Sequence, residues 1–190
     1  MKVGLFFGSF NPIHNGHLSI AHLLVETSKV DKVWFIISPQ NPLKSVASLA
    51  DEKDRYTMVA TAIQKFPLFS ASDVEFSLSK PSYTVNTLAS LANSYPKHEF
   101  FLIIGEDNLL NFSEWKDYKI ILEQYGLFVY PRPVTSKPLL ADHTSVHLLD
   151  EPIINISATI IRKSIKQGKS VEHLVPDSVA QIIKLRKLYL

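Results

Sequence analysis

The chain has 190 residues, of which 46% are hydrophobic and 20% are charged. This length and composition are typical of one water-soluble globular unit, so we expect residues 1–190 to form a single domain. Lys and Arg number 20 against 18 for Asp and Glu, and the resulting balance of +2 argues against a nucleic-acid or membrane-surface partner recognised by bulk charge. The absence of cysteine excludes disulfides, thiolate metal sites and a cysteine nucleophile.

The first residues, MKVGLFFGSFNP, carry a short apolar run that Gly8 and Pro12 interrupt. This run is too short for the core of a signal peptide, and no small-residue cleavage site follows it. No apolar stretch reaches the roughly 18 residues that a membrane-spanning helix needs. We therefore expect a cytoplasmic protein with no membrane partner.

Apolar strands alternate with amphipathic helices along the chain. Short β-prone runs bounded by Gly, Ser or Pro predict strands at 3–7, 32–37, 70–78, 99–104, 127–130 and 146–149. Helical periodicity and start signals predict helices at about 17–25, 51–65, 82–91, 113–125, 157–168 and 176–188, with Asp51, Ser82 and Ser157 as caps. The alternation predicts an α/β fold in which helices cover both faces of a parallel sheet. Ligands of such sheets bind beyond the carboxyl ends of the strands.

The segment between the first strand and the first helix reads GSFNPIHNGH (8–17). Small residues at Gly8 and Ser9 let a phosphate group approach the backbone, and Gly16 removes side-chain bulk where the helix begins. His14 and His17 are three residues apart at the helix N-terminus, where free N–H groups and the helix dipole attract anions. Two imidazole donors at this place predict a phosphate clamp.

Other interpretations of these two histidines stay open at this point. A single histidine is most often a solvated turn residue or a hydrogen-bonded core residue. Two histidines can also bind zinc, although no third ligand lies close in the sequence. The glycine-containing turn after a buried strand favours phosphate.

A second segment, ISATIIR (156–162), begins the helix that Ser157 is expected to cap. Thr159 and Arg162 then lie one turn apart on one face. Arginine offers a planar, permanently charged fork that suits phosphate oxygens. Taken alone, the segment favours an ordinary capped helix that carries a surface arginine.

Together the two segments resemble the HxGH superfamily of nucleotidyltransferases, whose motifs are GxFxPxHxGH and ISxTxxR. The resemblance implies a Rossmann-like doubly wound sheet, ATP as the adenylyl donor, and Mg²⁺ carried by the ATP phosphates without a metal site on the protein. It assigns catalysis to His14, His17 and Arg162. The implied ATP-binding residues come from both motifs and from the segment IGED (104–107): Gly8, Ser9, Phe10, Gly16, Gly105, Asp107, Ser157, Thr159 and Arg162.

Within that superfamily, the stretches SPQNPLK (38–44), SYT (82–84) and SEWKDY (113–118) resemble the bacterial nicotinate-nucleotide adenylyltransferases. The resemblance implies that Trp115 stacks on the pyridine ring, that backbone N–H groups of Tyr83 and Thr84 bind the nicotinate carboxylate, and that Asp107 binds a ribose hydroxyl. Lys44 would hold the mononucleotide phosphate. The full implied set for nicotinate mononucleotide is Asn41, Lys44, Tyr83, Thr84, Trp115 and Arg132. The implied products are deamido-NAD and pyrophosphate.

Several alternative functions have to be weighed. Phosphopantetheine adenylyltransferase shares the two outer motifs but lacks the counterparts of Trp115 and SYT. A nicotinamide-nucleotide adenylyltransferase differs only in the ring substituent that it accepts, and a silent ATP- or NAD-binding regulator would not need His14, His17 and Arg162 together. A nucleic-acid-binding module is disfavoured by near-neutral charge and the lack of a recognition motif. The sequence does not indicate the oligomeric state.

Overall fold

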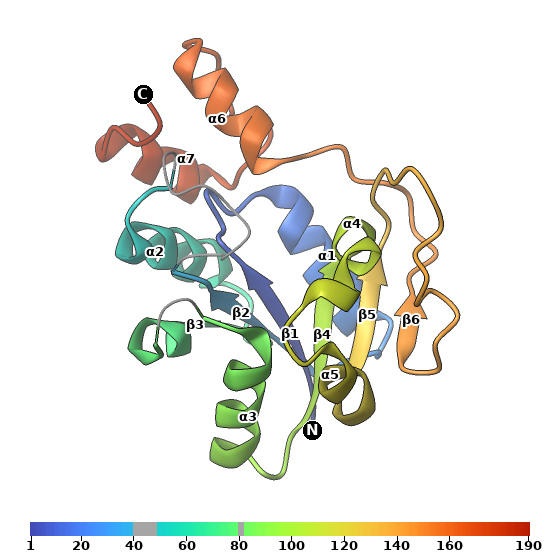
Figure 1. The fold of residues 1–190 in the computed structure, drawn as a ribbon. Coiled ribbons are helices and arrows are strands. Elements are labelled where there is room, and N and C mark those ends of the chain that lie inside the picture. The colour runs from blue at the N-terminus through green and yellow to red at the C-terminus, as the bar shows by residue number, and fades with distance from the viewer. Residues whose placement is uncertain (40–48, 80–81) are drawn as a thin grey trace.

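A six-stranded parallel sheet forms the centre of the computed structural model, which describes residues 1–39, 49–79 and 82–190 (Figure 1). The strands are β1 (Lys2–Gly8), β2 (Lys32–Ile37), β3 (Phe69–Ser72), β4 (Glu99–Gly105), β5 (Gly126–Tyr130) and β6 (Val146–Leu148). They lie in the order β3-β2-β1-β4-β5-β6, and every neighbouring pair is parallel. The direction of winding reverses between β1 and β4, and this is the position where doubly wound sheets bind ligands.

Helices cover both faces of the sheet (Figure 1). One face packs against α1 (Asn15–Glu26), α2 (Glu52–Ile63), α6 (Ala158–Lys166) and α7 (Asp177–Leu185). The other face packs against α3 (Thr84–Ser94), α4 (Glu106–Leu110), α5 (Tyr118–Gln124) and the 3-10 helix η3 (Phe112–Glu114). A second 3-10 helix, η2 (Val74–Ser77), follows β3. Within the residues that the structure describes, no helix is long and apolar enough to cross a membrane. The predicted α/β sheet with two covered faces is confirmed.

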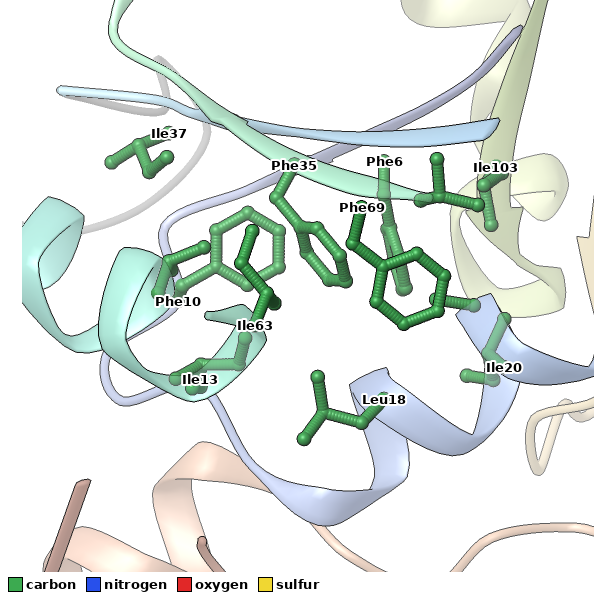
Figure 2. Packing of buried hydrophobic residues seen from close by; sticks show 14 of the residues in the cluster. Phe6, Phe10, Ile13, Leu18, Ile20, Phe35, Ile37, Ile63, Phe69 and Ile103 are labelled. Atoms are coloured by element: carbon green, nitrogen blue, oxygen red, sulfur yellow. The ribbon is translucent and has the colours of Figure 1, made fainter. Parts of the chain in front are cut away.

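The strands are apolar on both sides because each face of the sheet is covered. In β4, Phe101 packs on the α1 side and Leu102 on the α3 side, as the alternation of side chains along a strand requires. Phe6 of β1 stacks on Phe35 of β2, with ring centroids 5.7 Å apart. Figure 2 shows these two rings and Phe10 gathered between the sheet and the helices. Each fully buried ring of this kind contributes roughly 1.5–3 kcal/mol, so the end of β1 is firmly anchored.

Two predicted helix starts are confirmed, and a third is wrong. The Asp51 carboxylate accepts the Lys53 N–H at 2.8 Å, and the Ser157 hydroxyl accepts the Ile160 N–H at 3.3 Å. Ser82 is not the cap of α3, because Tyr83 occupies the N-cap position. A further difference is that α1 begins at Asn15 instead of at residue 17, so that His14 is its N-cap residue and His17 lies in its first turn.

Two other predictions were too long. The strand expected at 70–78 ends at Ser72, because the chain turns into η2 and buries the Glu75 carboxyl against the Thr87 hydroxyl. The helix expected at 113–125 is broken between η3 and α5, where Asp117 adopts a left-handed conformation with φ of 54°. This break leaves Trp115 in extended backbone outside both helices.

Candidate active site

A cavity of about 900 Å³ opens at the carboxyl ends of β1, β2, β4 and β5. It lies where the topology of the sheet predicts a ligand site. The sequence-predicted residues that line it are Gly8, Ser9, Phe10, His14, His17, Tyr83, Thr84, Gly105, Asp107, Trp115, Arg132, Ser157, Thr159 and Arg162. Two other predicted residues, Asn41 and Lys44, lie outside the described part of the chain.

The two motif histidines stack on each other in the wall of this cavity. Their ring centroids are 3.6 Å apart, and the planes differ by 20°. The Nδ1 atom of His17 accepts the backbone N–H of His14 at 3.3 Å, so in a neutral His17 ring the proton sits on Nε2. Burial and, to a lesser extent, the nearby Arg132 guanidinium lower the pKa of His14 to about 3. His14 is therefore neutral at physiological pH and can donate only one N–H.

An aromatic wall holds the His17 ring in place. Phe6 and Phe10 contact this ring edge-on, with centroids 5.5 and 5.1 Å away. Phe10 has a φ of 43°, a left-handed conformation that costs roughly 1–2 kcal/mol outside glycine. The ring of Phe10 folds back over Gly8, where a β-carbon would lie only 2.9 Å from it. Gly8 thus makes room for a buried ring that supports His17, in addition to any approach by phosphate.

The first turn of α1 offers fewer free N–H groups to the cavity than the sequence predicts. The Asn15 N–H donates to the carbonyl of Leu174 at 2.9 Å. Gly16 lies behind His14 and is not among the residues that line the cavity, and its predicted contact with ATP stays a prediction. A β-carbon at Gly16 would lie 3.1 Å from both the His14 ring and Ile154. The glycine therefore permits close packing of the segment before α6 against the histidine.

The late motif meets the first motif through Arg162. One of its terminal nitrogens, Nη1, donates to the backbone carbonyl of Asn11 at 2.9 Å. The other, Nη2, donates to the Thr159 hydroxyl at 3.4 Å, as expected for residues one turn apart on one helical face. Segments at opposite ends of the chain thus place two imidazoles and a guanidinium in one cavity.

Arg132 connects β5 to the segment that precedes α6. Its Nη1 donates to the carbonyls of Ile154 and Ile156, at 3.2 and 3.4 Å, and its guanidinium lies 5.2 Å from the centre of the Tyr130 ring. Since its charge acts on His14, Arg132 lies at the histidine end of the cavity. This position adds a cation to the wall that the histidines form.

A second group of predicted residues lines the cavity at the start of α3. Tyr83 is the N-cap residue, and no side chain caps this turn among the residues that the structure describes. The first N–H groups of a helix have no intrahelical acceptor, so those of α3 can serve a ligand. Trp115 is half-buried against Phe112, with ring centroids 5.0 Å apart, and the Lys116 ammonium lies 4.7 Å from the Tyr83 ring centre. These residues combine an aromatic surface with donors suited to a carboxylate.

Gly105 and Asp107 lie together where β4 ends. A β-carbon at Gly105 would collide with the Asp107 carboxylate, so only glycine lets this carboxylate fold back over the strand end. Asp107 is the second residue of α4 and contributes an acceptor to a cavity that is otherwise rich in donors.

Sequence reasoning missed several buried polar residues around the cavity. Arg55 and Glu75 are 1% and 2% exposed. Burial raises the pKa of Glu75, and its carboxyl accepts the Thr87 hydroxyl at 2.7 Å. Charged residues of amphipathic segments usually face water, so nothing in the local pattern distinguished these two. Among the described residues, no group of three or more His, Asp and Glu side chains is placed to hold a metal ion.

Comparison with known proteins shows which family this chain resembles. The family described as cytidylyltransferase-like matches residues 5–164. A protein of Cytophaga hutchinsonii named "Probable nicotinate-nucleotide adenylyltransferase" is 53% identical over 189 residues, which cover 100% of this chain and 98% of that protein. A protein of the same name from Flavobacterium johnsoniae is 44% identical over 192 residues, covering 100% and 99%.

Solved structures share the fold over nearly the whole chain. The nicotinic acid mononucleotide adenylyltransferase of Plasmodium falciparum, complexed with NaAD, superimposes with a TM-score of 0.84 at 19% identity, covering 99% of this chain and 97% of that one. A putative nicotinate-nucleotide adenylyltransferase from Vibrio parahaemolyticus gives a TM-score of 0.72 at 22% identity, covering 99% and 94%. At these identities the likeness establishes the fold.

Proposed function

Because this chain belongs to the cytidylyltransferase-like family, and within it to the nicotinate-nucleotide adenylyltransferases, we propose that its cavity joins ATP to nicotinate mononucleotide. The products are deamido-NAD and pyrophosphate. One observation carries the assignment of the site. Arg162, from the segment 156–162, donates a hydrogen bond to the Asn11 carbonyl in the segment 8–17, and both segments line a cavity that also contains Trp115.

The chemistry requires positioning and charge stabilisation more than proton transfer. A phosphate oxygen of the mononucleotide forms a bond to the α-phosphorus of ATP, and the bond from that phosphorus to the bridging oxygen breaks. The electron pair leaves with pyrophosphate. Since the nucleophile is already an anion, no general base is needed, and the barrier is lowered by alignment and by donors aimed at the developing charge.

The histidine end of the cavity is the proposed ATP phosphate site. His14 and His17 donate to oxygens of the α- and β-phosphates, while Thr159 and Arg162 hold the β,γ end. Gly8, Ser9 and the backbone of Phe10 border the same phosphates, Ser157 starts the helix that presents Arg162, and Gly105 with Asp107 borders a ribose. A neutral His14 fits this role because its N–H can donate to phosphate without the cost of charging a buried ring.

Magnesium fits this site as an ion coordinated by the ATP phosphates. The charged and ring side chains near the phosphates are imidazoles and guanidinium groups, which do not bind magnesium, whereas phosphate oxygens and water do. When bound, the ion neutralises part of the phosphate charge. The mutual repulsion of the two anionic substrates is further offset by Lys44, which we assign with Asn41 and Arg132 to the mononucleotide.

The α3 end of the cavity is the proposed site of the nicotinate ring. Trp115 supplies the stacking surface, and the N–H groups at Tyr83 and Thr84 donate to the ring carboxylate, where the helix dipole adds to their attraction. We further propose that residues 1–190 act as one domain in the cytoplasm.

The test uses ATP labelled at the α-phosphorus, with nicotinate or nicotinamide mononucleotide as acceptor. We expect label in deamido-NAD and a kcat/KM preference of several hundredfold or more for the acid. An amide would turn its NH₂ toward backbone donors, at a cost of about 1–3 kcal/mol for each mismatched contact. Trp115→Ala should weaken use of both acceptors, since both lose the stacking surface.

Two results would count against this assignment. Label that stays in ATP with either acceptor, while the protein still binds ATP, would exclude adenylyl transfer to these nucleotides. Equal kcat/KM values for the acid and the amide would remove the carboxylate site at α3 while leaving adenylyl transfer in place.

A further inference from the structure

Asn11 is a meeting point of three distant segments. Its side-chain oxygen accepts the Tyr189 hydroxyl at 2.8 Å and the Ala50 backbone N–H at 3.1 Å. Its backbone carbonyl accepts Arg162 Nη1 at 2.9 Å. Asn11 is only 4% exposed, so these bonds are shielded from water and their geometry restricts the residue strongly. The same residue that orients Arg162 is thus held through its side chain by Tyr189.

Tyr189 reaches this place from the segment after α7. Its backbone takes a left-handed turn with φ of 66°, and its ring packs against the core on the α1 side of the sheet. Burial raises the pKa of the hydroxyl well above its ordinary value, although the charges of Arg55 and Arg162 act in the opposite direction. The hydroxyl is therefore protonated across the physiological range and acts as the donor to Asn11.

We propose that Tyr189 is a positioning residue for adenylyl transfer, which acts by holding Asn11 in the orientation that directs Arg162 to the ATP phosphates. The proposal rests on the proposed function for its activity readout. The chain at Asn11 follows Phe10, whose φ of 43° is strained, and precedes Pro12, which has no N–H to donate. The side-chain oxygen of Asn11 links this stretch to two distant segments, and Tyr189 supplies one of these two hydrogen bonds.

The variant Tyr189→Phe removes only the hydroxyl and keeps the buried ring. We expect kcat/KM for ATP to fall about tenfold, since small displacements of a positioning group cost up to about 10²-fold in rate. KM for nicotinate mononucleotide should stay within about twofold. The matched control is Arg186→Ala, which breaks the ion pair between the same C-terminal segment and Asp54 without touching Asn11. This control should leave kcat/KM for ATP within about twofold of the original.

A double-variant cycle separates positioning from general destabilisation. If Tyr189 acts through Arg162, Tyr189→Phe should have no further effect on kcat/KM for ATP in an Arg162→Ala background. A purely structural role would give the same fold-loss in both backgrounds. That result, or a single variant within twofold of the unmodified protein, would overturn the proposal.

Calorimetric titration with ATP distinguishes this failure from failure of the proposed function. Tyr189→Phe should raise the ATP dissociation constant several-fold when Arg162 is present and leave it unchanged when Arg162 is alanine. This readout needs no acceptor, so it decides the role of Tyr189 even if the unmodified protein transfers nothing to nicotinate mononucleotide. An ATP affinity that does not respond to Tyr189→Phe in either background would contradict the proposal.

Discussion

His14 and His17 show how two identical side chains, three residues apart, acquire different properties from their surroundings. His14 is 2% exposed and lies near the Arg132 charge, so its ring is kept neutral. His17 stacks on it and packs edge-on against two phenylalanine rings. The spacing in the sequence predicts that both flank one site, but only the packing shows which ring is buried.

The first prediction concerns His17→Ala. A hydrogen bond that strengthens as charge develops at phosphorus affects the transition state more than the bound substrates. We therefore expect kcat to fall on the order of 10²–10³-fold, roughly 3–4 kcal/mol, with little change in KM for nicotinate mononucleotide. Steady-state kinetics with both substrates varied provides the measurement.

The matched control for His17→Ala is His173→Ala, which removes an exposed imidazole outside the cavity wall. That variant should keep kcat within about twofold. If His17→Ala also retains kcat within about tenfold, His17 takes no part in the chemistry.

At the scale of elements, Arg55 of α2 joins the ends of the neighbouring strands β1 and β2. Its guanidinium donates to the backbone carbonyls of Ser9 at 2.7 Å, Ser38 at 2.8 Å, Pro39 at 3.0 Å and Ala50 at 3.0 Å. These carbonyls follow β1, follow β2 and precede α2. A single buried side chain thus satisfies four backbone acceptors that lie outside helices and strands, two of them at residues that line the cavity.

Arg55→Met keeps the bulk of the side chain but leaves these carbonyls without their donor. Since each buried group left unpaired costs about 1–3 kcal/mol, we expect the free energy of unfolding to fall by about 3–5 kcal/mol. Urea unfolding provides the measurement. Arg55→Lys should be intermediate, because an ammonium cannot span four acceptors in a planar fork. Lys53→Met, a change at an exposed position of the same helix, should leave the free energy of unfolding nearly unchanged. An equally small change for Arg55→Met would refute the role of Arg55.

The local sequence pattern predicted helices and strands well where its signal was strong. The run EFFLII predicts a strand over 99–104, and β4 occupies 99–105. The pattern failed in the region 113–125, because a left-handed residue at Asp117 breaks a segment whose helical periodicity is otherwise good. Ser82 failed as a cap for a similar reason, since its hydroxyl is buried and Tyr83 takes the cap position. Tertiary packing decides both cases, and propensity carries no information about it.

For the whole molecule, the α/β architecture followed from the alternation of strands and helices, but the order of strands did not. The placement of β1 between β2 and β4 brings Ser9, Ser38 and Asp107 to one edge of the sheet. The motif resemblance predicted fourteen of the residues that line the cavity, among them both histidines and Arg162. Arg55 and Tyr189 belong to no motif and act over separations of up to 178 residues, which local analysis cannot reach.

The buried ionisable side chains also predict how the stability of the whole protein depends on pH. His14 has a pKa of about 3 in the folded state and 6.5 as its reference value, so between these values the unfolded chain binds more protons. Its contribution therefore lowers the free energy of unfolding as pH falls below 6.5, by up to about 1.4 kcal/mol per pH unit. Glu75 acts in the opposite sense: burial raises its pKa, so its contribution is present below 4.5 and is lost as pH rises through the folded pKa.

The variant His14→Gln isolates the histidine contribution, because Glu75 and all other titrating groups remain. On going from about pH 7 to about pH 5 in the absence of ligand, the original protein should lose about 2 kcal/mol more stability than the variant. The figure follows from a reference pKa of 6.5 and a folded pKa too low to matter in this range. Urea unfolding of both proteins at a series of pH values gives the two slopes. If the slopes coincide, His14 takes up its proton as readily in the folded protein as in the unfolded chain, and a neutral, buried imidazole at the ATP phosphates is ruled out.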